Sequence, residues 1–256
     1  MKPSEIADEL LKVGLEISNK IDTKIPAGIA ENESSLEKWI FLFFYFKARK
    51  TYKAIVLLWN QGYPEDAFIL TRTLFEISLQ ARYISEDPQS RSEQFIRFDP
   101  VRRWRHFEKL RKSGVENFLQ EMEKKPEMLQ QLKHDHDESM KKFCYPKNSQ
   151  NWWGESLEWL AKHLGNGTDP IYFGLYPIQS GHVHSDIRSS KAYLKLYGGN
   201  FVFNDSSDLG NNIVIPMEAT RNLIIVASYF VNIFDLKLEN ELSSAIDQVR
   251  KLSGIV

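Results

Sequence analysis

Apolar residues recur every three to four positions along most of this chain, and only a helix turns that spacing into a continuous buried stripe. The clearest stripe, between Ser4 and about Ile21, consists of Ile6, Leu10, Val13, Ile17 and Ile21. The same periodicity predicts helices near residues 35–61, 64–87, 89–113, 115–143 and 216–236, with shorter helices between the last two and one more at the end. Prolines should bend or break the 89–113 helix at Pro100 and interrupt the next at Pro126. The sequence therefore predicts an all-α, multi-helix bundle.

One stretch departs from the helical pattern. Residues 192–197 alternate in character, Gly198 and Gly199 follow, and residues 200–203 are again rich in strand-forming side chains. This pattern predicts a β-hairpin with a glycine turn as a small insert near residues 192–203. A two-stranded hairpin is marginal by itself, so we expect it to pack on the helices. Without repeats or low-complexity linkers, residues 1–256 are interpreted as a single helical domain.

Length and composition limit the class of protein. The chain has 256 residues, 42% of them hydrophobic, and chains of about 300 residues bury roughly 75% of their unfolded surface without disulfide support. The one cysteine, Cys144, excludes an intramolecular disulfide and fits a reducing cytoplasm. The apolar runs at residues 40–46 and 223–234 are shorter than the roughly 20 residues of a membrane span, so we expect buried core helices and no membrane. A net charge of −1 gives no global preference for nucleic acid.

Arg72 and Glu76 form a polar pair inside the largely apolar helix of residues 64–86. Two apolar arcs flank the pair, which indicates that this helix packs on two sides. The pair either faces water or belongs to a buried network. If it is buried, removal of one partner should cost roughly 3–5 kcal/mol, so stability alone could explain it.

A second polar feature is the stripe Tyr172, Tyr176, Ser180 and His184, whose members lie four residues apart and share one helical face. We expect this stripe to meet the Arg72–Glu76 pair in one pocket. His184 could act there as a general acid or base, or as a hydrogen-bonded structural residue. His182 points to the opposite side of the helix, so the two histidines should not share a metal. A metal held by His182 with Asp186, or by His184 with a distant carboxylate, stays an alternative.

A third feature is a run of basic residues interleaved with aromatic ones. Arg102, Arg105, His106, Lys109 and Lys112 fall on one helical face, with Phe98, Trp104 and Phe107 nearby. Such a face is either solvated or able to hold a phosphate backbone. The chain lacks GxxxxGK[ST], HExxH, GxSxG and CxxC motifs, and no cofactor is predicted. The Arg-x4–6-His spacing of many small helical ribonucleases is also absent.

Several short motifs together resemble a known family. They are Arg72-x3-Glu76, Arg97-Phe98, Trp153 followed by Ser156, and Tyr176-x3-Ser180-x3-His184, spread over residues 60–190. This arrangement resembles the bacterial family called domain of unknown function 5677. The resemblance implies a helical bacterial protein without an established activity, in a family similar in outline to helical toxin and phage-defence ribonucleases.

The leading hypothesis is a cytoplasmic, metal-independent enzyme of toxin or defence type that acts on RNA or nucleotide phosphodiesters. Its catalytic residues would be Arg72, Glu76 and His184, and its substrate-binding residues would be Tyr176, Ser180, Arg102, Arg105 and Lys109. One alternative is a non-enzymatic interaction or assembly protein in which Arg, Glu, Ser and His form a structural network. Another is a metal hydrolase that uses Glu76, His184 and either His182 or Asp186. A homodimer through the aromatic-rich helix of residues 35–61 is compatible with each.

Overall fold

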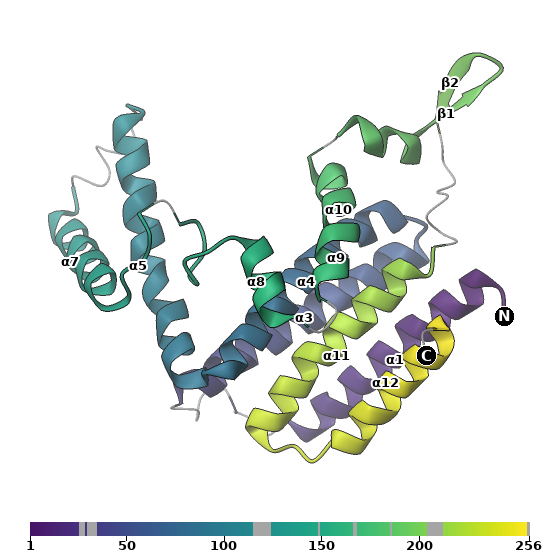
Figure 1. Ribbon diagram of the computed structural model, residues 1–256, viewed down its shortest axis with the longest axis horizontal. Helices are drawn as coiled ribbons and strands as arrows, with labels where there is room; N and C mark the ends of the chain where they lie inside the picture. The colour runs from purple at the N-terminus through teal and green to yellow at the C-terminus, as the bar shows by residue number, and fades with distance from the viewer. Residues whose placement is uncertain are drawn as a thin grey trace. The chain divides into compact units, whose positions relative to one another are not determined.

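The computed structural model is helical apart from one small hairpin, which confirms the predicted all-α class with a hairpin insert (Figure 1). The structure describes residues 1–25, 29, 35–114, 124–147, 149–165, 168–184, 186–203 and 212–254. These residues form two compact units. Unit 1 combines Met1–Glu86 with Ala161–Val256, and unit 2 is the continuous stretch Asp87–Leu160. That the whole chain folds as a single domain stays a prediction.

The elements follow one another in the order of the sequence. Most of unit 1 is formed by α1 (Pro3–Lys24), α3 (Leu36–Asn60), α4 (Pro64–Glu86), α9 (Thr168–Gly174), α10 (Tyr176–Val183), η1 (Ile187–Ala192, a 3₁₀ helix), β1 (Leu194–Tyr197), β2 (Asn200–Phe203), α11 (Val214–Phe234) and α12 (Glu239–Ser253). Unit 2 contains α5 (Pro88–Lys112) and α7 (Pro126–Phe143), and α8 (Leu157–Leu164) runs across the boundary between the units.

The core of unit 1 is built around α11, which packs against α1, α3, α4 and α12. The predicted stripe on α1 is buried from Leu10 to Ile21, both fully inaccessible to solvent, whereas Ile6 at its start is half-buried. Hydroxyl groups also connect these helices. Tyr52 of α3 donates to the Leu11 carbonyl over 2.9 Å, and Thr220 of α11 donates to the Leu10 carbonyl over 2.9 Å. Three helices from distant parts of the chain are thereby held at fixed positions.

The central helix α11 is long and apolar enough to cross a membrane, with a mean hydropathy of 1.2. Of that span, 67% is buried inside the protein. This burial is expected for a core helix, because its apolar side chains are already covered by the surrounding helices.

Helix α3 is apolar on two sides, and only one of them is covered. Its inner side buries Phe41, Phe44 and Tyr45. Residues that the periodicity also marked as helical and apolar are instead exposed, by 45% at Trp39, 38% at Phe43, 41% at Phe46 and 62% at Leu57. Apolar spacing thus predicted the helix and left open which side the core would use.

Unit 2 is built on the packing of α5 against α7. The expected break at Pro100 is not observed, since α5 continues through it from Pro88 to Lys112. Proline removes the hydrogen bond to the carbonyl four residues earlier, and that residue, Ile96, is exposed, so water can replace the missing donor. Helix α7 begins at Pro126, the residue at which the sequence predicted an interruption. Residues 115–123 of the predicted 115–143 helix lie outside the described residues.

The Tyr172–His184 segment forms two helices that meet at Leu175, next to Pro177. The hairpin follows in the predicted place, with Leu194 opposite Phe203 and Tyr197 opposite Asn200. Gly198 and Gly199 have φ values of +56° and +82°, which is the type I′ turn that tight hairpins need. The expected packing of the hairpin on the helices is wrong for most of its side chains, because among the described elements only η1 contacts it extensively.

Candidate functional site

The polar pair of α4 is held together by a residue from another helix. Arg72 Nε donates to Glu76 Oε1 over 3.1 Å, and the two side chains are 18% and 36% exposed. The Tyr176 hydroxyl donates to the same Glu76 oxygen over 3.0 Å and accepts from Arg72 Nη2 over 2.5 Å. An arginine four residues before a glutamate is the weaker orientation for a helical ion pair, and here a phenol reinforces it.

The ring of Tyr176 strengthens this contact. The guanidinium carbon of Arg72 lies 4.2 Å from the ring centroid, within cation–π range. The ring of Tyr172 stacks on the ring of Tyr176, with centroids 5.1 Å apart and planes inclined by 23°. Burial, followed by the negative charge of Glu76, raises the pKa of Tyr176 to about 12, although Arg72 opposes the shift. The phenol is therefore neutral at pH 7 and can donate its hydrogen bond to Glu76.

Two further residues of α10 face α4. Gln179 is 2% exposed, and its amide nitrogen donates to the Phe68 carbonyl over 3.4 Å. The His182 ring meets Phe68 edge-on, with centroids 5.7 Å apart. The inner face of α10 therefore follows the spacing i, i+3, i+6 from Tyr176, and not the i, i+4, i+8 stripe that the sequence suggested. Sequence reasoning missed Gln179, and it considered His182 only as a possible metal ligand.

Several buried polar atoms of α4 and α10 lack a hydrogen-bond partner among the described residues. They are Glu65 Oε1, Arg72 Nη1, Gln179 Oε1 and His182 Nδ1. Buried polar groups are nearly always hydrogen-bonded, to protein or to ordered water. We call the contact between α4 and α10 the α4–α10 seam. Its unpartnered polar atoms offer both hydrogen-bond donors and acceptors to water or to a polar ligand.

His184 does not belong to this cluster. It follows the last residue of α10, is exposed, and makes no side-chain hydrogen bond with a described residue. It lies eight residues beyond Tyr176, or about 12 Å along the helix at about 1.5 Å per residue. Ser180 lies between Tyr176 and His184 along α10 and is half-buried. The expected pocket is therefore found only in part: Arg72, Glu76 and Tyr176 come together, whereas His184 lies apart from them.

No ready-made metal site is found in the described part of the chain. Nowhere do three or more His, Cys, Asp or Glu side chains gather closely enough to hold a metal ion. His182 is half-buried against Phe68, while His184 and Asp186 are exposed. The grouping of His182, His184 and Asp186 that would support a metal hydrolase is thus not formed, and Ser185 between them lies outside the described residues.

Comparison with known proteins yields one match. The model of a family of unknown function, DUF5677, matches residues 38–201, which include α4, α10 and β1. The chain belongs to this family. No curated protein and no solved structure matches it. The match covers every motif that carried the resemblance, and it brings no support for a likeness to ribonucleases.

In this DUF5677 protein the basic residues of unit 2 fall into two groups. Arg105 is held in place, since its Nη1 donates to the Ser149 carbonyl over 2.6 Å and its Nη2 to the Pro146 carbonyl over 2.9 Å. Partial burial lowers the pKa of Arg105 from its usual value. Arg102 and Lys109, in contrast, are exposed. Arg105 therefore fixes a loop, and only the other two are placed to meet a dissolved polyanion.

A cavity of about 540 Å³ lies beside Arg105 in the DUF5677 chain, between α5 and α7. Basic and aromatic side chains share its wall: Trp104, Arg105, Lys109, Lys112, His136 and Lys147. Glu108 is the one carboxylate in this lining. The excess of positive charge favours anions, and the aromatic rings can stack on planar groups.

Proposed function

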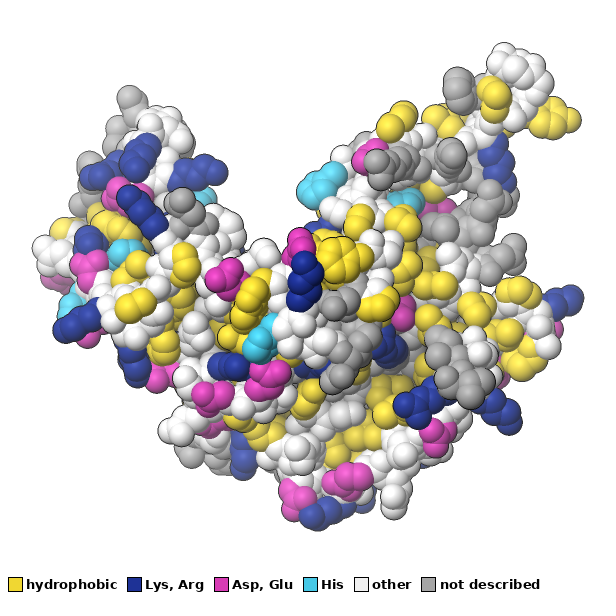
Figure 2. Space-filling model, in the orientation of Figure 1, with side chains coloured by type: hydrophobic (Ala, Val, Ile, Leu, Met, Phe, Trp, Pro, Cys, Tyr) yellow, Lys and Arg dark blue, Asp and Glu magenta, His cyan; other side chains and the backbone are white. Residues whose placement is uncertain are grey.

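We propose that this protein is a non-enzymatic assembly protein that pairs with a second copy of itself through its β-hairpin. The observation that carries the proposal is the exposure of one apolar face of the hairpin. Leu194, Leu196 and Phe203, which share this face by the register of the strands, are 39%, 67% and 86% exposed. Hydrophobic side chains are visible on the hairpin in Figure 2. Contiguous exposed apolar surface marks an interaction site.

A second copy is the occupant that fits this apolar hairpin face (Leu194, Leu196, Phe203). The face carries no charge, and the one charged residue of the strands, Lys195, lies on the opposite face. An uncharged apolar face is complementary to itself, so a two-fold axis can bring two copies together. Because strands need more than one hairpin for independent stability, two stacked hairpins would also stabilise each other.

The α4–α10 seam has a structural role in this proposal. It anchors α10 to α4; α10 in turn contacts η1, and η1 contacts β1. Arg72, Glu76 and Tyr176 form hydrogen bonds with one another in this arrangement, and His184 is not among them. The network thus holds the segment that carries the hairpin at a fixed place on unit 1.

The expected assembly is weak. Strands of four residues are about 13 Å long, so two hairpin faces bury well below the roughly 1,200 Å² of a stable complex. Sedimentation velocity over roughly 1–200 µM protein should therefore show dimers that accumulate with concentration. Phe203→Lys should abolish them, because it places a charge in the paired face.

Val202→Lys is the matched control, because it adds the same charge one residue away, on the opposite face. Dimers should persist in that variant. A wild-type protein that stays monomeric throughout the range, or equal loss of dimers in both variants, contradicts the proposal. Far-ultraviolet circular dichroism of the two variants should match that of the wild type, which separates lost pairing from lost folding.

A second candidate is the enzyme of toxin or defence type that acts on RNA or nucleotide phosphodiesters. The observation in its favour is Arg72 Nη1, a buried donor without a partner among the described residues, on a guanidinium whose other contacts fix its orientation. Such a donor can stabilise charge that develops on a phosphate. In this candidate Glu76 orients Arg72, Tyr176 and Ser180 position the substrate, and His184 transfers protons near the end of α10, apart from Arg72.

Turnover distinguishes the two candidates. Single-stranded RNA and ATP should be cleaved by the wild type and cleaved at least about 100-fold more slowly by His184→Ala, as for the loss of a general acid or base. Equal rates in the two proteins, or no cleavage by either, would remove the enzyme from consideration and leave the assembly proposal untouched.

A further inference from the structure

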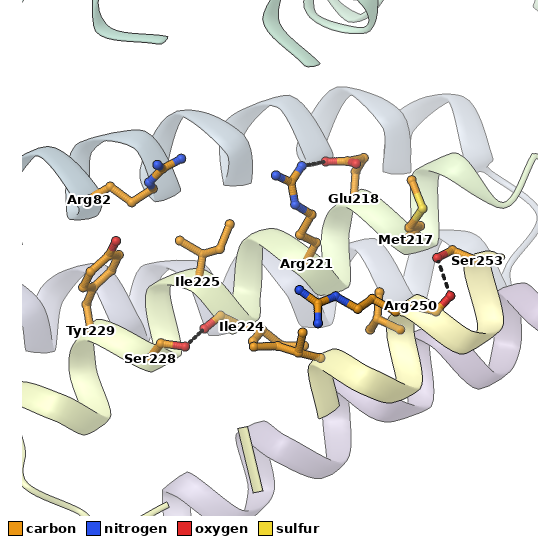
Figure 3. Close-up of a pocket in the computed structure, with 12 residues that line it drawn as sticks. Arg82, Met217, Glu218, Arg221, Ile224, Ile225, Ser228, Tyr229, Arg250 and Ser253 are labelled. Carbon is orange, nitrogen blue, oxygen red and sulfur yellow. Dashed lines mark hydrogen bonds and ion pairs between the residues drawn. The ribbon is translucent and has the colours of Figure 1, made fainter. Parts of the chain in front are cut away.

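A second cavity lies in unit 1 between α4, α11 and α12, and it shares no residue with the α4–α10 seam (Figure 3). Its volume is about 560 Å³, within the range of roughly 300–1,000 Å³ that is typical of small-molecule sites. Neither proposed function uses this cavity.

Most of the cavity wall is apolar. The side chains responsible are Met217, Ile224, Ile225 and Tyr229 of α11 together with Ile246 and Val249 of α12. Ile224 is almost fully buried, so the wall continues directly into the core of unit 1. The apolar part of a ligand placed against these side chains would be shielded from water by α11 on one side and by α12 on the other.

The polar part of the lining is dominated by arginines, one from each helix: Arg82, Arg221 and Arg250. In Figure 3 the side chains of Arg221 and Arg250 extend from α11 and α12 toward the same space. Arg221 Nη1 contacts Glu218 Oε2 at 3.3 Å, and Glu218 is the one carboxylate in the lining. With three guanidinium groups and one carboxylate in its lining, the cavity carries an excess of positive charge.

Arg250 is the guanidinium best placed to receive a ligand. Its side chain is 66% exposed, and its ion pair with Asp247 is a long one, at 3.6 Å between two solvated groups. Exposed pairs of this kind contribute little, so the guanidinium can exchange that partner for another anion at small cost. Arg82 is less available, because its Nη2 already donates to the Leu164 carbonyl over 3.1 Å.

We propose that this cavity binds a small amphiphile that carries an anionic head group, a carboxylate or a phosphate, on an apolar body. The head group lies between Arg221 and Arg250, whose planar guanidinium groups match the geometry of both kinds of anion. The apolar body lies along Ile224 and Ile225. A cation is repelled by the excess positive charge, and a neutral analogue loses the charged hydrogen bonds.

Titration calorimetry with three ligands of one chain length tests the proposal on the full chain. Decanoate, decanol and decylamine share the same apolar tail and differ in charge, and each is used as dissolved monomer. Decanoate should bind saturably at one site, decanol at least about tenfold more weakly for want of charged hydrogen bonds, and decylamine not measurably.

Two variants and one control locate the site. Arg250→Gln should raise the Kd for decanoate at least about fivefold, whereas Lys251→Gln, the same charge change at the next position of α12, should not. Lys251 does not line the cavity. Ser228→Phe should abolish binding because the larger side chain fills the cavity. Among the described residues the Ser228 hydroxyl donates only to the Ile224 carbonyl of its own helix, so loss of this hydroxyl disturbs no other element.

Each other result overturns the proposal. Equal affinities for decanoate and decanol would show that the arginines do not select the ligand. Equal effects of Arg250→Gln and Lys251→Gln would indicate attraction by overall charge, without a site. Binding to vesicles of phosphatidylglycerol but not to monomeric decanoate would assign this surface to a membrane, and absence of all binding would leave the cavity without a ligand of this class.

Discussion

The hydroxyl of Tyr176 should hold α10 on α4, and the substitution Tyr176→Phe isolates its contribution. The change keeps the ring, and with it the cation–π contact to Arg72 and the stacking on Tyr172. It removes the two hydrogen bonds to Glu76 and Arg72. Hydrogen bonds to charged groups contribute about 1.5–3 kcal/mol, and because Glu76 is 36% exposed we expect that range for the two bonds together, and not for each.

Hydrogen exchange measured by mass spectrometry reports this loss locally. Amides of α10 exchange when the helix detaches or opens, and a loss of 1.5–3 kcal/mol corresponds to exchange that is about 10- to 150-fold faster, at about 1.4 kcal/mol for each factor of ten. Tyr197→Phe is the control, because Tyr197 is 79% exposed and its hydroxyl should contribute nothing measurable.

A double-mutant cycle then separates a structural network from a water-filled cleft. If Tyr176 acts through Arg72, the effects of Tyr176→Phe and Arg72→Met should fall short of additivity by about 1 kcal/mol or more. Exchange of α10 that stays within about a factor of two of the wild type in Tyr176→Phe, or strict additivity in the double variant, would refute the reasoning, since water would then replace the hydroxyl without cost.

Three other predictions concern the rest of the chain. Gly14→Ala should destabilise unit 1 although alanine favours helices by about 1 kcal/mol, because the new Cβ would lie 2.3 Å from the Tyr52 hydroxyl; thermal melts should show a lower Tm, and in a Tyr52→Ala background the same change should raise it. Arg105→Met should speed exchange in residues 145–153 by at least about tenfold, as two bonds to carbonyls are lost, whereas Arg102→Met should leave it unchanged. Burial raises the pKa of Glu218, so the folded state holds this proton more tightly than the unfolded state, and stability should fall as the pH rises above the ordinary value of 4.5. Urea midpoints from pH 4 to 7 should show this decline in the wild type and a smaller one in Glu218→Gln.

The parts of the fold that the sequence predicted are those in which local pattern and packing agree. The α1 stripe has five members spaced three or four residues apart, so its buried side was unambiguous, and Leu10 and Ile21 are indeed inaccessible. The glycine pair at 198–199 required a turn with positive φ, and both residues have it. Burial of one helical face accounts for the apolar residues of α1, and the positive φ of the turn accounts for the two glycines.

The inner face of α10 could not be predicted in the same way. The spacing from Tyr172 to His184 assumed one continuous helix, but two short helices meet at Leu175. In a helix of eight residues, spacings of three and four are equally plausible, and tertiary contacts with Phe68 selected the face of Gln179 and His182. The contacts of Arg105 could not be predicted for another reason: its partners are backbone carbonyls of a loop, which no side-chain pattern reveals.

The two units differ in how their residues are distributed along the chain, and this sets an order of events during synthesis. A ribosome completes all of unit 2 before α11 and α12 exist, so residues 87–160 can reach their final contacts while translation continues. The first helix has no such opportunity, because its main partners, α11 and α12, are among the last residues made. The apolar stripe of α1 therefore stays exposed to water until more than half of the polypeptide has been synthesised. This exposure makes the first helix a binding site for chaperones during biosynthesis.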